Sequence, residues 1–130
     1  MRNLELPVLL LLLLGLAACG TSAVDRNTTA ASISRIGIDA TAGGIEVACE
    51  DPQSEDALHR CLRAVETHEA LRAAWDVWAA AILLAASEED ENAIEMMLRM
   101  SGPVFELYEE VSEMLRQFGV DVPALPGMEQ

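Results

Sequence analysis

The side chains in this chain that could bind a metal ion or transfer protons are two histidines and 22 acidic residues. His59 and His68 are nine residues apart, so on one helix they point in nearly opposite directions and cannot share a ligand. Paired carboxylates catalyse proton transfer when burial keeps one of them protonated, and nothing near the main glutamate run indicates burial. We therefore predict a solvated helix face or a docking surface there, and no catalytic residue, metal or cofactor. The glutamates of this run are Glu106, Glu109, Glu110 and Glu113.

The charge of the chain excludes several classes of partner and reaction. Its 130 residues carry 22 acidic and 8 basic side chains, which gives a formal net charge of −14. A nucleic-acid partner requires a clustered basic surface, and the arginines here are scattered singly among carboxylates. Because the sequence contains no lysine, Schiff-base catalysis and the P-loop amine are also excluded.

The first 18 residues are typical of a signal peptide. Arg2 precedes an apolar stretch that includes the leucine tract from Leu9 to Leu14. The stretch is shorter than the roughly 20 apolar residues that a transmembrane helix needs, which favours a leader at 1–18 that is removed.

Residues Leu16, Ala17, Ala18 and Cys19 resemble the lipobox of bacterial lipoproteins. The resemblance implies that Cys19 becomes a lipidated N-terminus, held to a bilayer because burial contributes about 0.8 kcal/mol per methylene. In Gram-negative lipoproteins an aspartate after the cysteine usually retains the protein at the inner membrane, so Gly20 favours the outer membrane. We therefore expect an envelope domain that faces the periplasm or the exterior, joined to its membrane by a flexible tether at 19–32.

Cys49 and Cys61 remain once Cys19 is assigned to lipid, and an even number of cysteines in an exported chain predicts a disulfide. The turn-forming cluster at 51–54 would bring their flanks together. The crosslink would stabilise the fold by about 3 kcal/mol in the chain-entropy model. The alternatives are a metal-binding pair and two unpaired thiols.

Residues 54–119 are expected to form two helices joined by a tight turn. Ser54 opens a stretch that has no glycine or proline until Gly102 and whose apolar residues fall at helical spacing. Ser87 is the predicted N-cap of the second helix, and Gly119 follows as its C-cap. The helices span about 55–86 and 89–118. Their predicted core positions are Ala57, Cys61, Ala64, His68, Leu71, Trp75, Trp78, Ile82 and Ala85, then Ile94, Met97, Ser101, Val104, Tyr108, Val111, Leu115 and Phe118.

A turn at 87–90 sets the register of this antiparallel hairpin, with facing residue numbers that sum to about 176. His68 then lies beside Tyr108 as a polar pair in the core. Trp75 reaches the region of Ser101, because buried polar tips need hydrogen-bond partners. Core positions are favoured for Trp75 and Trp78, and anchors of an interaction surface are the alternative.

Residues 33–50 fit two kinds of structure. Strand alternation is present on both sides of Gly43 and Gly44, but a lone two-stranded hairpin is marginal in water. We therefore predict a helix at about 32–50, packed on the next helix through the link from Cys49 to Cys61. Its expected packing face consists of Ile33, Ile36, Ala40, Gly44 and Val47.

These elements predict an all-α fold, a small helical bundle of one long antiparallel hairpin and a shorter N-terminal helix. The helical domain spans 33–119, and the tail at 120–130 is expected to be extended. The alanine-rich, lysine-free body resembles small uncharacterised helical lipoproteins of bacteria or their phages. We expect a non-enzymatic, membrane-tethered scaffold or binding module, whose partner is another envelope protein or a second copy of the chain. The alternative is a phage-encoded envelope effector, either a spanin-like lysis subunit or a superinfection-exclusion lipoprotein.

Overall fold

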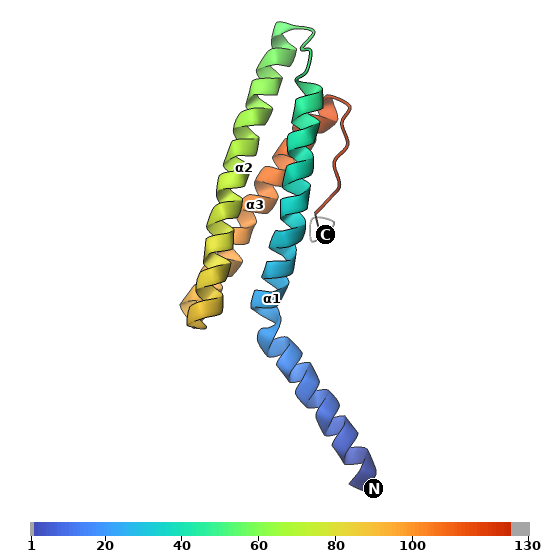
Figure 1. Cartoon of the computed structure of the whole chain (residues 1–130), viewed down its shortest axis with the longest axis vertical. Coiled ribbons are helices and arrows are strands. Elements are labelled where there is room, and N and C mark those ends of the chain that lie inside the picture. The colour runs from blue at the N-terminus through green and yellow to red at the C-terminus, as the bar shows by residue number, and fades with distance from the viewer. Residues whose placement is uncertain (1, 126–130) are drawn as a thin grey trace.

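The computed structural model describes the backbone of residues 2–125 and the side chains of residues 23–125. The chain forms three helices in the order α1 (Arg2–Ala48), α2 (Glu55–Glu88) and α3 (Glu91–Gln117). The helices α2 and α3 form an antiparallel hairpin, and α1 packs against both (Figure 1). The predicted all-α helical bundle is confirmed, and residues 33–48 form a helix instead of a β-hairpin.

Local signals set the ends of the hairpin helices. The Ser54 hydroxyl accepts a hydrogen bond from the backbone N–H three residues on, at 3.1 Å, and so caps α2. The helix α2 ends at Glu88, and Glu89 caps it with a left-handed φ of 53°. The prediction that Ser87 caps the second helix is wrong, because Ser87 stays inside α2 and the Asp90 carboxylate caps α3 instead. Gly119, with a φ of 79°, follows the end of α3 as predicted.

The core lies where the three helices meet, and the positions predicted for α2 and α3 are all buried or half-buried. Residues of α2 and α3 line common clefts, Arg63 with Glu113 and Trp78 with Leu98. The largest fully buried side chains of these two helices are Trp78, Tyr108, Leu71, Met97, Leu115, Val104 and Val111.

The face of α1 predicted to pack against the bundle is wrong at four of its five positions, since only Gly44 is buried. Small residues let the backbone of α1 approach its neighbours closely. The hydroxyls of Ser34 and Thr41 donate to carbonyls of their own helix at 2.6 Å, so neither of these two buried hydroxyls is left unpaired. The residues that face the core are Ala31, Ser34, Ile38, Thr41 and Ile45, and the exposed ones are Ile33, Ile36, Ala40 and Val47.

The flexible tether predicted for 19–32 is also corrected, because the structure continues α1 through this segment. From residue 23 onward the segment packs on the bundle, and Ala31 is buried. The side chains of Thr28 and Ser32 donate to carbonyls one turn earlier, which supports a helix in a sequence of modest helix propensity. Cys19 and the other side chains of 1–22 lie outside the part of the chain whose side chains are described.

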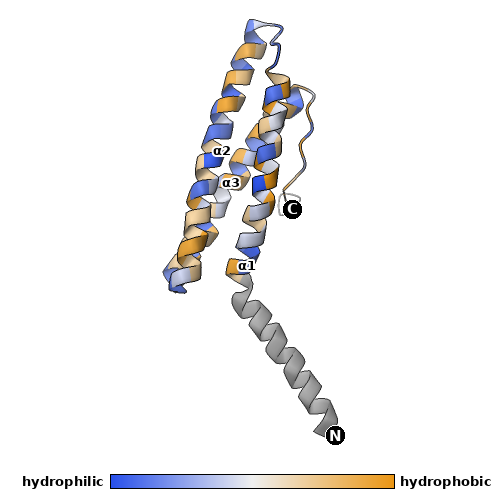
Figure 2. Cartoon of the chain, in the orientation of Figure 1, coloured by the Kyte–Doolittle hydropathy of each residue, from blue (hydrophilic) through white to orange (hydrophobic). Residues whose placement is uncertain are grey.

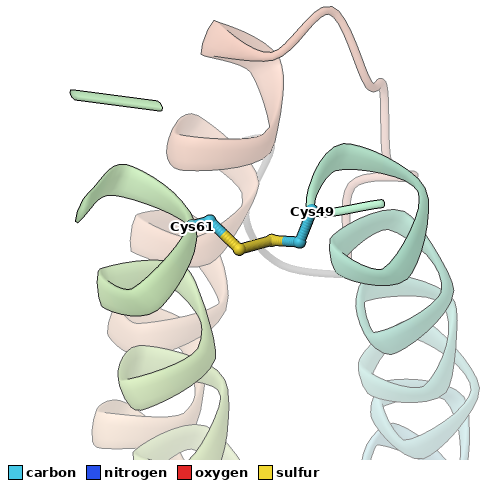
Figure 3. The surroundings of a disulfide bond; sticks show 2 residues. All are labelled: Cys49 and Cys61. Atoms are coloured by element: carbon cyan, nitrogen blue, oxygen red, sulfur yellow. A yellow bond between two sulfur atoms is a disulfide. The ribbon is translucent and has the colours of Figure 1, made fainter. Parts of the chain in front are cut away.

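A disulfide joins the C-terminal end of α1 to the first turns of α2 (Figure 3). The Cα atoms of Cys49 and Cys61 are 5.6 Å apart, which confirms the predicted pairing. Beyond α3, residues 120–125 form neither helix nor strand and run back beside α1 (Figure 1). Leu125 is 2% exposed, so this part of the predicted extended tail is tied to the bundle, while residues 126–130 lie outside the described part.

Apolar and polar residues are interleaved along α2, α3 and the coloured part of α1 (Figure 2). Within residues 23–125, one helix, α2, is long and apolar enough to cross a membrane by length and composition alone. This is weak evidence, because a core helix passes the same test and the buried residues of α2 face α1 and α3.

Candidate functional site

Trp78 is a core residue that links all three helices. Its side chain is 1% exposed, and its indole N–H donates to Asn27 Oδ1 on α1 at 3.1 Å. Its ring centroid lies 5.8 Å from that of Phe105 on α3. The alternative that Trp78 anchors an exposed interaction surface is therefore wrong, because the bundle itself covers the ring.

Trp75 also bonds to α1, in a different place from the one predicted. Its indole N–H donates to the carbonyl oxygen of Ala31 at 2.9 Å, so the expected contact with Ser101 does not form. The Arg35 guanidinium lies 4.9 Å from the centroid of the Trp75 ring, in a cation–π contact. Both of these contacts come from α1, whose packing face the sequence pattern predicted wrongly.

His68 and Tyr108 converge on neighbouring residues of α1. The Nε2 atom of His68 lies 3.2 Å from the carbonyl oxygen of Ile38, so that nitrogen carries the proton. The Tyr108 hydroxyl packs against Gly37 and donates to the carbonyl oxygen of Pro123 in the tail. The bundle thus gives both polar tips backbone carbonyls as partners. Burial raises the pKa of the Tyr108 phenol above its ordinary value, and a hydrogen bond with Ser112 opposes that shift.

The remaining histidine, His59, is exposed on α2. Among residues 23–125, no group of three His, Cys, Asp or Glu side chains is placed to hold a metal ion. In the same part of the chain, the buried side-chain nitrogen and oxygen atoms all have hydrogen-bond partners.

The predicted acidic face is present on α3, and its four glutamates are exposed. Arg116 pairs with Glu113 within this face, and Arg99 pairs with Glu95 two turns before it, at 3.0 Å. Exposed ion pairs of this kind contribute little to stability. The face is therefore available for contact with a partner.

A shallow cleft of about 240 Å³ between α2 and α3 gives this face a mixed charge. Arg60 and Arg63 line it from α2, opposite Glu110 and Glu113. The Arg60 guanidinium also lies 5.6 Å from the centroid of the Phe118 ring. The sequence pattern predicted the exposed carboxylates but not these arginines, although the predicted register of the hairpin places Arg63 beside Glu113.

The exposed apolar residues of α1 form a second candidate surface. Ile33, Ile36, Ala40 and Val47, here called the α1 stripe, recur at helical spacing on the outward side of the helix. Ile36 is 71% exposed and Val47 is 67% exposed. Single exposed apolar residues are ordinary in soluble domains, but a row along one helix is typical of an interaction site.

No protein-family model, curated protein or solved structure matches this chain.

Proposed function

We propose that this chain is a lipoprotein anchored through Cys19, and that its helical domain is a non-enzymatic scaffold or binding module of the cell envelope. The Cys49–Cys61 disulfide carries the proposal, because such crosslinks persist in oxidising compartments and are rare in the cytosol. The run Leu16, Ala17, Ala18 and Cys19 adds the lipobox-like sequence that would anchor an exported chain. With Gly20 after the cysteine, the outer membrane is the proposed site.

A binding role is supported by the two surfaces outside the core. The α1 stripe offers apolar contact, and the acidic face of α3 offers charge. A partner protein of the envelope that presents an apolar groove, or a second copy of this chain, would cover the α1 stripe. The charged groups of the acidic face would contribute more to the association rate and to specificity than to affinity.

The anchor is tested by expressing the full chain and the Cys19→Ser variant in a bacterium and fractionating the cells. We expect the unaltered chain in the membrane fraction, with a mass that corresponds to cleavage before Cys19 and addition of acyl chains. The variant should be free of acyl mass and should leave the membrane fraction. An intact leader, or an unmodified Cys19 in soluble material, would contradict the proposal.

The binding role is tested with a photocrosslinking residue introduced at Ile36, compared with the same residue at Leu62. Both side chains are more than half exposed, but Leu62 lies on the outer face of α2. Crosslinks that form from position 36 and not from position 62, and that disappear on Val47→Asp, would support the α1 stripe as the binding surface. Equal crosslinking from the two positions would contradict it, and the mass of the product distinguishes a second copy from another protein.

A further inference from the structure

An apolar surface lies on the hairpin itself, on the side of α2 and α3 that α1 does not cover. At one end of this surface, Met114 of α3 lines the same cleft as Arg63 of α2. Helical spacing continues the surface from these two residues along both helices toward the turn. Its large apolar residues, here called the hairpin face, are Val77 and Leu84 of α2 and Met96, Met100, Leu107 and Met114 of α3.

The hairpin face is open to solvent and has the composition of a helix-packing surface. Val77 is 54% exposed, and the other residues of the face are exposed or half-buried. The helix α1 lies on the other side of the hairpin, where His68 and Trp75 bond to it. Methionine side chains adapt to the shape of a partner and are common at binding surfaces. Exposed alanines between the larger residues of α2 leave room for another helix to approach closely: Ala70, Ala73 and Ala80.

The charges at the two ends of the hairpin face differ. Arg60 and Arg63 lie at the Met114 end, and within the described part of the chain neither forms an ion pair. Glu88 and Glu91 border the turn at the other end and form no ion pair within that part either. The sequence has no basic residue from 73 to 98, so this chain supplies no cation near its own turn. Positive charge at the turn must therefore come from a partner.

We propose that the hairpin face binds a second copy of this chain, turned end for end, so that the arginines of each copy lie beside the acidic turn of the other. A two-fold axis across the helices gives this arrangement, in which both chains use the same surface. A two-fold axis along the helices would instead place the two acidic turns together, and repulsion between like charges opposes that arrangement. Charge complementarity thus selects both the partner and its orientation.

The proposed pairing sets a register between the two α2 helices. If Arg63 of one copy lies beside Glu88 of the other, facing residues of α2 have numbers that sum to about 151. Ala70 of one copy then lies near Ala80 of the other. The inference extends the proposed binding role to a surface other than the α1 stripe, and it does not depend on the anchor at Cys19.

Disulfide trapping between two copies tests the register. Ala70→Cys and Ala80→Cys are placed in separate, differently tagged full chains that are expressed together in one bacterium, and the cells are oxidised mildly. The matched control pair is Val65→Cys with Leu83→Cys, because both residues are exposed on the outer side of α2 and their numbers have nearly the same sum. Mass spectrometry identifies the linked residues.

We expect at least ten times more of the 70–80 crosslink between chains than of the 65–83 crosslink. Equal yields would overturn the proposal, and so would a crosslink from position 70 or 80 to a different protein. Crosslinking from position 36 reports on the α1 stripe separately. Failure of this proposal is therefore distinguished from failure of the proposed function.

Charge reversal tests the orientation, with the yield of the 70–80 crosslink as the readout. Arg63→Glu and Glu88→Arg should each lower the yield at least fivefold, because like charges then meet at both ends of the pair. The two substitutions together should restore the yield, since each chain again presents opposite charges to the other. Both residues are exposed, so the helical circular dichroism signal should not change. Unchanged yields in the single variants, or no recovery in the double variant, would count against the proposal.

Discussion

The polar tips of the buried aromatic and histidine side chains determine how α1 sits on the hairpin. Trp75 donates to Ala31, Trp78 donates to Asn27, and His68 bonds to Ile38. A shift of α1 along the hairpin would leave all three donors unpaired, at a cost of about 1 to 3 kcal/mol each. These hydrogen bonds therefore fix the position of α1 along the hairpin. Apolar packing of small residues alone is less directional and would not fix it.

Tyr108 should make the stability of the fold depend on alkaline pH. Burial raises the pKa of its phenol above the ordinary 10.0, so the folded state holds the proton more tightly than the unfolded state. The resulting stabilisation is complete below pH 10 and is lost as the pH rises through the folded-state pKa. Because the chain has no lysine and Tyr108 is its only tyrosine, few other groups titrate in this range.

The measurement is denaturant unfolding of the parent chain and of Tyr108→Phe at about pH 9 and about pH 11. At pH 9 the variant should be less stable by about 1 kcal/mol, because it lacks the hydrogen bond to Pro123. Between the two pH values the parent should lose more stability than the variant. The same loss in both proteins would show that Tyr108 is not responsible.

At the scale of the elements, α1 packs through small residues and leaves larger apolar ones outside. Gly37 and Gly44 are buried where the tail crosses α1, while Gly43, next to one of them, has no neighbouring atom within 4 Å of an added Cβ. One side of α1 therefore lies in close contact with the tail. Another side, the α1 stripe, exposes apolar side chains to solvent.

Replacement of Gly37 by leucine should detach the tail from α1. The new side chain would overlap Leu125 and the Tyr108 ring, and overpacking of this kind costs about 1 to 3 kcal/mol. Gly43→Leu is the matched control, and it should be neutral or stabilising by up to about 1 kcal/mol because leucine favours helix. Unfolding free energies measure both effects, and hydrogen exchange at residues 120–125 reports the release of the tail. A Gly37→Leu protein as stable as the control would disprove the close contact.

For the whole molecule, the disulfide joins the two longest helices at one end of the bundle. It closes a loop between residues 12 apart in sequence, which restricts the unfolded chain and stabilises the fold by about 3 kcal/mol. The rest of the bundle has no other covalent link between helices among the described residues. Its remaining stability depends on the apolar core and on the bonds from α2 and α3 to α1.

Reduction of the disulfide should lower the free energy of unfolding by about 3 kcal/mol. The double variant Cys49→Ser and Cys61→Ser should match the reduced parent and should not respond to reductant. Thermal unfolding with and without reductant checks both statements. If the parent chain were insensitive to reductant, the crosslink would not contribute to the stability of the fold.

The sequence by itself determined the helices α2 and α3, the left-handed glycine that follows α3 and the pairing of Cys49 with Cys61. These features depend on periodicity and on local signals, which are visible in any single chain. It also identified the exposed glutamates of α3, because charged residues at consecutive helical positions face solvent whatever the neighbours are.

Only the tertiary structure decided which side of α1 is buried and where its polar partners lie. Hydropathy favoured Ile33, Ile36 and Val47 as core residues, but Ser34 and Thr41 are the residues that α1 buries against the hairpin. Their hydroxyls can be buried because they donate hydrogen bonds to backbone carbonyls of the same helix. The role of Trp78 and the position of Arg63 beside the acidic face likewise depend on which residues lie across from them. Glycine, serine and threonine carry only a weak hydropathy signal, so their burial follows from the shape and hydrogen-bonding groups of the surfaces that they meet.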